Sequence, residues 1–107
     1  MAITAAFQPR SAAVTVNIAV SGSSQNVAVF TSSLTTVPNM QVRFYNNGNA
    51  VTLVEFGTNS TVTANATTSL PLAPNSIEVV TVPYGTTYIA AIGTTGNTLY
   101  MTPGEGP

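Results

Sequence analysis

Two β-rich segments flank the polar tetrapeptide Asn46-Asn47-Gly48-Asn49, and this arrangement constrains the fold more than any other part of the chain. Asn-Gly is a strong signal for a tight turn between antiparallel strands, because both residues tolerate positive φ. The first segment alternates, with Met40, Val42 and Phe44 on one face and Gln41, Arg43 and Tyr45 on the other. We therefore predict a β-hairpin over residues 40–57.

The second arm of this hairpin is apolar on both faces, so its register needs a separate argument. A two-residue turn would set Val51 opposite Phe44 and would direct Glu55 into the core. A turn one residue longer directs the alternate set inward: Thr52, Val54 and Phe56. A slip of one residue moves every side chain to the other face. We favour the longer turn, because it keeps Glu55 with Arg43 on the solvated face.

Short segments of β character recur along the chain at spacings of roughly 8–12 residues, separated by Pro, Gly, Asn and Ser. Outside the hairpin the predicted strands cover residues 14–20, 25–30, 60–64, 77–82, 88–92 and 98–102, with a further short strand within 67–70. The 77–82 strand is apolar on both sides, which favours a central position. No segment has a helical period. The sequence predicts an all-β fold, an antiparallel β-sandwich or jelly roll of about eight short strands in one domain over residues 14–107.

The interior of this predicted sandwich takes one face from each major strand. The residues expected there are Val42, Phe44, Val54, Phe56, Val79, Ile89 or Ile92, and Leu99 or Met101. Residues 1–13 have no sustained period, and Pro9 cannot donate a hydrogen bond to a strand ladder. We expect residues 1–13 to form an extended N-terminal arm.

Charged residues make up only 5 % of the 107-residue chain, against about 25 % in an average domain. The formal net charge is -1, and the mean hydropathy is +0.30. A surface covered by Thr, Ser, Asn and Gln provides little charge repulsion between molecules. We expect the protein to bury part of this surface against copies of itself or a larger assembly; the alternative is a neutral monomer with a hydroxyl-rich surface.

The residue types needed for most catalytic sites are missing. The sequence has no His, Cys, Asp or Lys, which excludes Ser-His-Asp triads, thiolate nucleophiles and Schiff-base lysines. Glu55 and Glu78 could form a glycosidase pair if their carboxylates faced each other, but two solvated strand residues are the simpler interpretation. Isolated glutamates do not make a calcium site. We predict no enzymatic activity, no metal and no cofactor.

Two arginines do not make a basic patch, so nucleic-acid binding is not expected. No apolar run approaches the roughly 20 residues that span a bilayer, so no membrane association is expected. Protein surfaces remain the class of partner that this composition favours.

Three patterns in the C-terminal half point to a family. They are a Pro74-Asn-Ser76 turn before a Val-rich strand, the strand Ile89-Ala-Ala-Ile92, and the ending Leu99-Tyr-Met-Thr-Pro-Gly-Glu-Gly106. Together with the 40–57 segment, they resemble small β-sandwich decoration or cement proteins of tailed bacteriophages. The resemblance covers residues 40–106, while residues 1–39 match no pattern of that family.

This resemblance implies a virion structural protein on the phage capsid surface, made in the host cytoplasm. It implies the major capsid protein as partner and a homo-oligomer, a trimer before a dimer. Similar proteins also occur at necks, tails and head fibres. An alternative from another class is a carbohydrate-binding or adhesin-like module that uses tyrosines and amide side chains on its loops.

Four side chains are candidates for partner contact. Phe7 and Arg10 lie in the predicted arm, where they would anchor it on a neighbouring subunit or on the capsid; the alternative is a disordered tail. Arg43 and Tyr45 lie on the solvated face of the first hairpin strand.

Overall fold

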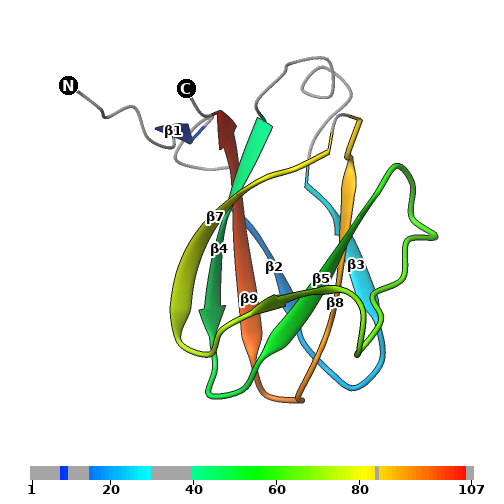
Figure 1. The fold of residues 1–107 in the computed structure, drawn as a ribbon, viewed down its shortest axis with the longest axis vertical. Coiled ribbons are helices and arrows are strands. Elements are labelled where there is room, and N and C mark those ends of the chain that lie inside the picture. Colours follow the sequence, from blue (N-terminus) through cyan, green and yellow to red (C-terminus); the bar gives the residue numbers. More distant parts are fainter. Residues whose placement is uncertain (1–7, 10–14, 30–39, 84, 106–107) are drawn as a thin grey trace.

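The computed structural model describes residues 8–9, 15–29, 40–83 and 85–105. Within these ranges every regular element is a β-strand, and the strands form two antiparallel sheets that face each other (Figure 1). Sheet A contains β1 (Gln8–Pro9), β2 (Val16–Ala19), β4 (Met40–Asn47), β7 (Ser76–Thr81) and β9 (Thr98–Glu105). Sheet B contains β3 (Gln25–Ala28), β5 (Thr52–Gly57), β6 (Leu70–Leu72) and β8 (Tyr88–Ile92).

The strand pairs are nested along the chain. β2 pairs with β9, β3 with β8, β4 with β7 and β5 with β6, all antiparallel. The chain therefore forms one long antiparallel ribbon that turns back on itself between β5 and β6. The ribbon is rolled, so that successive strand pairs lie alternately in sheet A and sheet B. Pairing of β4 with β9 and of β5 with β8 then completes each sheet. Nested pairing of this kind is jelly-roll topology, so the predicted fold class is confirmed.

The predicted hairpin over residues 40–57 is wrong. β4 lies in sheet A and β5 in sheet B, and residues 48–51 carry the chain from one sheet to the other. The choice of inward face is nevertheless confirmed, because the core lies between the sheets. Thr52 and Val54 are at most 1 % exposed, and Phe56 is partly buried.

Arg43 and Glu55 do not share a face, contrary to the sequence prediction. Arg43 projects from the outer side of sheet A and is exposed, whereas Glu55 alternates with inward residues of sheet B and is partly buried. Its Oε1 accepts a hydrogen bond of 2.9 Å from Ser69 Oγ. The strands of a hairpin share one sheet and one outer face; a crossing between two sheets puts these side chains on opposite sides of the molecule.

The crossing is held by buried amide groups. Asn46 is 1 % exposed, and its Nδ2 donates to the carbonyl oxygens of Ala50 at 3.0 Å and Ala73 at 3.1 Å. Asn97 Nδ2 donates to the same Ala50 oxygen at 3.0 Å. These side chains satisfy main-chain acceptors that have no strand partner at the crossing, where an unpaired buried carbonyl would be costly.

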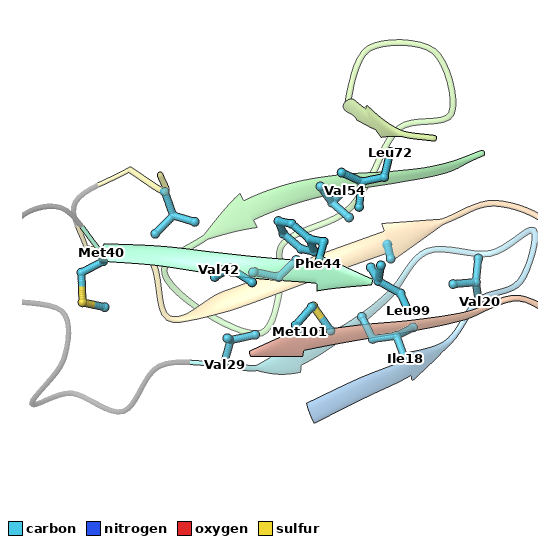
Figure 2. Close-up of a cluster of buried hydrophobic side chains, with 13 residues drawn as sticks. Ile18, Val20, Val29, Met40, Val42, Phe44, Val54, Leu72, Leu99 and Met101 are labelled. Carbon is cyan, nitrogen blue, oxygen red and sulfur yellow. The ribbon is translucent and has the colours of Figure 1, made fainter. Parts of the chain in front are cut away.

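The core fills the space between the sheets, as Figure 2 shows. Phe44 from sheet A lies against Phe56 from sheet B, with ring centroids 6.5 Å apart. The buried hydrophobic cluster comprises Ile18, Val20, Val29, Met40, Val42, Phe44, Val54, Leu72, Val82, Ile89, Ala91, Leu99 and Met101. The predicted core is confirmed at most positions, with both Leu99 and Met101 buried and Ile89 inward in preference to Ile92.

Val79 is the exception, because it is 45 % exposed. The strand predicted over 77–82 is β7, which pairs with β4 alone and forms an edge of sheet A. The central position predicted from its apolar residues on both faces is therefore wrong. In the jelly roll, β9 occupies the central position beside β4, since β9 pairs with β4 along eight residues.

Other boundaries differ in smaller ways. The strand over 88–92 is confirmed as β8, but residues 60–64 form a turn and irregular structure with no strand. The short strand expected within 67–70 lies at Leu70–Leu72. β9 continues past Pro103, where a stop was expected.

Pro103 is tolerated in β9 because its main-chain nitrogen points toward the β2 side of the strand. Val20 N donates to Asn97 O at 2.9 Å, so odd-numbered residues of β9 direct their main-chain groups toward β2. At Pro103 that side lies between the partners of β2, which end at Met101, and those of β1, which begin at Gly104. The N–H that Pro103 lacks would point to this side of β9 and not toward β4, so the β4–β9 hydrogen bonds do not need it.

Part of the predicted arm lies inside the fold. Gln8 and Pro9 pair with Glu105 and Gly104 of the same chain, so this stretch is a short edge strand. Phe7 and Arg10 lie outside the described residues, and their contact roles stay predictions.

We expect Phe44→Ala to lower the free energy of unfolding by about 3–5 kcal/mol. The substitution removes a fully buried ring of sheet A that packs against Phe56 of sheet B. Urea denaturation measures the change. Asn47→Ala, at an exposed site on the same strand, should change stability by less than about 0.5 kcal/mol. Equal effects of the two variants would contradict the assigned faces of β4.

A second prediction concerns Gly48, which lies in the crossing between the two sheets. A Cβ atom there would clash with Oδ1, Cγ and Cβ of the Asn97 side chain. Gly48→Ala should therefore displace Asn97 and cost about 1–3 kcal/mol. Gly22→Ala is the matched control, since its Cβ would meet nothing within 4 Å. Thermal unfolding compares the two, and a Gly48→Ala variant as stable as the control would show that Asn97 does not hold the crossing.

Candidate protein-binding surface

The outer side of sheet A brings together five side chains from three strands. They are Arg43 and Tyr45 of β4, Ile77 and Val79 of β7, and Tyr100 of β9, and we call this surface the β4–β7 face. The sheet register sets Ile77, Tyr45 and Tyr100 in one row across the strands. Val79 and Arg43 begin the next row, which continues with Thr102. Alternation along each strand directs all of these side chains away from the core.

The β4–β7 face is more apolar than a solvated surface needs to be. Ile77 is 55 % exposed, Val79 45 % and Tyr45 37 %, and the three are adjacent. Among the described residues, the other large exposed hydrophobic side chains are Val51 at the crossing and Leu70 on the edge strand of sheet B. Contiguous exposed apolar residues of this kind make the β4–β7 face the candidate interaction surface of the described residues.

Tyr45 and Tyr100 form the rigid part of this face. Their rings stack with centroids 5.8 Å apart and planes inclined by 18°. The two residues are directly opposite each other on β4 and β9, so the sheet itself fixes their separation. Stacked tyrosines provide a large contact area with little conformational freedom left to lose on binding, which suits a protein interface.

Arg43 supplies the positive charge of the face. It is exposed between Val79 and Thr102, and the carboxylates of Glu55 and Glu78 are held elsewhere. An arginine beside apolar and aromatic side chains can donate hydrogen bonds to a carboxylate or a carbonyl oxygen of a partner.

The two glutamates that could have formed a catalytic pair occupy separate environments. Glu55 accepts a hydrogen bond from Ser69 in the loop before β6. Glu78 lies on β7 at the edge of sheet A, where its Oε2 accepts from Ala73 N at 3.2 Å and Ser76 Oγ at 3.4 Å. Each carboxylate is therefore bound by its own loop, and they belong to different sheets.

Within the described part of the chain, no three His, Cys, Asp or Glu residues gather closely enough to hold a metal ion. A search of the same residues finds no helix long and apolar enough to cross a membrane.

Two of the four predicted contact residues, Arg43 and Tyr45, lie together on the β4–β7 face. The sequence prediction missed its other members: Ile77, Val79 and Tyr100. The signal for Ile77 and Val79 is the apolar run of β7, which predicts burial on both sides of the strand. An edge strand with an outward apolar face has the same sequence pattern.

Comparison of the chain with models of known families, with curated proteins and with solved structures finds no match.

A double-mutant cycle can test the stacking of Tyr45 on Tyr100. Tyr45→Ala and Tyr100→Ala should each lower stability modestly, and their effects should be non-additive by about 0.5–1.5 kcal/mol, the usual value for an aromatic pair. Chemical denaturation of the two single variants and the double variant measures this coupling. A coupling near zero would mean that the rings do not stack in solution.

Proposed function

We propose that the protein is a structural protein of a tailed-bacteriophage virion, a decoration or cement protein that binds the capsid surface through its β4–β7 face. The observation that carries this proposal is the adjacency of Ile77, Val79 and the Tyr45–Tyr100 stack on one exposed sheet face. The partner would be the major capsid protein.

The mechanism is burial of neutral surface. Covering a few hundred Å² of apolar area gives several kcal/mol at about 25 cal/mol per Å², before the cost of association. Few charged groups would need to be dehydrated, since charged residues make up only 5 % of the chain. Repetition over a symmetric shell would multiply such modest contacts into strong binding. Pulling capsid subunits apart would then also expose this surface to water.

The fold supports the proposal by analogy. Jelly rolls occur in viral capsid proteins, and also in lectins and cupins. The sequence has no His, Cys or Asp to build a cupin-type metal site. The pattern resemblance of residues 40–106 to phage decoration proteins favours the virion role among the remaining possibilities.

A carbohydrate-binding module is the second candidate, and the Tyr45–Tyr100 stack is the observation that favours it. Exposed aromatic rings can contact the apolar face of a sugar. Such a site would depend on the tyrosines and would not need Ile77 or Val79. Isothermal titration with common monosaccharides and oligosaccharides distinguishes the two functions, since a structural protein of this type should show no saturable binding.

The direct test uses phage particles that lack this protein, produced from the encoding phage with the gene deleted. Purified protein is added back, and its binding is measured by co-sedimentation with the particles. Tyr45→Glu should weaken binding about tenfold or more, as expected for a central interface tyrosine. Ala28→Glu adds the same charge at an exposed position on the outer side of sheet B and should bind as the wild type does.

Folding of both variants is checked by thermal unfolding before binding is compared. Absence of wild-type binding to the depleted particles would reject the capsid role. Equal loss in both variants would show that binding depends on net charge and not on the β4–β7 face.

A further inference from the structure

The free side of β7 presents main-chain groups that pair with nothing in the described part of the chain. Val82 N donates to Met40 O at 3.0 Å, which fixes the alternation along this strand pair. Val80 and Glu78 therefore direct their N–H and C=O groups toward β4. The intervening residues Ile77, Val79 and Thr81 direct theirs away from the sheet.

This open segment has defined ends. Before it, Asn75 has a left-handed conformation with φ of 49°, so the extended strand begins after it. After it comes Pro83, which has no N–H to offer at the next outward position. Between these limits three consecutive outward residues provide alternating donors and acceptors. Ile77 and Val79 among them also carry exposed apolar side chains.

The other sheet edges are protected against pairing in familiar ways. β6 has three residues and contains Pro71. β3 has four residues and is polar at its start, and Asn26 Nδ2 is already bonded to Ser60 O. On the other side of sheet A the edge strands are short, with four residues in β2 and two in β1. Only β7 among the described edges combines six residues, no Pro or Lys, and an apolar outer face, which is the pattern that invites another strand.

We propose that β7 pairs antiparallel with β7 of a second copy of this chain, about a two-fold axis at Val79. Val79 then faces Val79 of the second copy, and Ile77 faces its Thr81. Each of these outward pairs exchanges two main-chain hydrogen bonds, so the contact forms about six. The two A sheets become one continuous sheet with the β4–β7 faces of both copies on the same side.

Repulsion between the two Glu78 carboxylates and the missing N–H of Pro83 favour the register with its axis at Val79. Shifting the axis to residue 78 would set Glu78 directly opposite Glu78 of the second copy, and like charges in that position are destabilising. With the axis at Val79, Glu78 faces Val80 of the second copy. The Glu78 carboxylate is also drawn toward Ala73 and Ser76, away from the axis. Shifting the axis to Val80 would bring Pro83 into the ladder without a donor.

A second copy suits this edge better than a different strand does. An isologous contact needs one surface that complements itself, and the Val79-centred register provides this. The two Arg43 side chains would stand three strand spacings apart, about 14 Å at the backbone, beyond the screening length in physiological salt. The formal net charge of -1 adds little repulsion between copies.

The contact is small, on the order of 1,000 Å² or less, which belongs to weak or transient interfaces. We expect a dimer that dissociates in the micromolar range. This pairing does not depend on a virion role, but it would double the β4–β7 face offered to a partner. It gives two-fold symmetry in solution, in place of the trimer that the family resemblance implies.

Analytical ultracentrifugation of the purified full chain at about 10–500 µM tests the proposal. The wild type should sediment as a monomer–dimer equilibrium. Val79→Lys should raise the dissociation constant about tenfold or more, because two lysines would face each other at the axis. Asn47→Lys, with the same charge at an exposed site away from this edge, should dimerise as the wild type does.

Mixing Val79→Lys with Val79→Glu tests the register itself. Only an axis at Val79 sets residue 79 opposite its own counterpart, so the mixture should regain the dimer that each variant alone has lost. A wild-type monomer at all concentrations, a trimer, or failure of the mixture to recover would each overturn the proposal. A monomer that still binds capsids would leave the proposed function standing, so the two can fail separately.

A cross-linking experiment gives an independent measure. The chain has no cysteine, so Val79→Cys introduces a single thiol. Directly opposite residues have Cα atoms about 5.5 Å apart, within the range of a disulfide. Mild oxidation should convert Val79→Cys largely to a covalent dimer. Ile77→Cys, which would face Thr81, should cross-link far less, and equal yields would overturn the register.

Discussion

The crossing between the two sheets at residues 48–51 depends on the buried amide of Asn46. Its Nδ2 reaches main-chain oxygens of Ala50 and Ala73, on both strand connections that meet there. Because those oxygens are satisfied by side chains, β4 and β5 can part and join different sheets. β4 is then free to pair with β7 and β9, which places β7 at an edge and creates the β4–β7 face.

The surface chemistry follows from this arrangement. Short strands and prolines protect sheet edges from pairing, and the described edges at β6, β3, β2 and β1 are short, with Pro71 in β6. At β7 it shows none, and the apolar side chains of Ile77 and Val79 are added to the open main chain. We therefore propose protein contact as the role of this surface, because it needs few ionisable groups.

Local alternation was sufficient to assign the inward and outward faces of β4, although not those of β7. Alternation in 40–45 placed Val42 and Phe44 inside and Arg43 and Tyr45 outside, because strand periodicity is a local property of the backbone. Strand 88–92 and the absence of helical period were likewise readable from local pattern. Two of the four predicted contact residues, Arg43 and Tyr45, lie on the surface that the structure brings together, while Phe7 and Arg10 lie outside the described residues.

Strand partners and strand position required the tertiary structure. An Asn-Gly turn is compatible both with a hairpin and with a crossing between sheets, and only the buried acceptors around Asn46 decide between them. An apolar run such as Ile77–Val82 is compatible with a central strand and with an edge strand whose outer face awaits a partner. Local sequence determines which side of a strand is apolar. The pairing of distant strands decides whether that side faces the core or the solvent. Pairing cannot be read from one segment, because several segments compete for the same hydrogen-bonding edge.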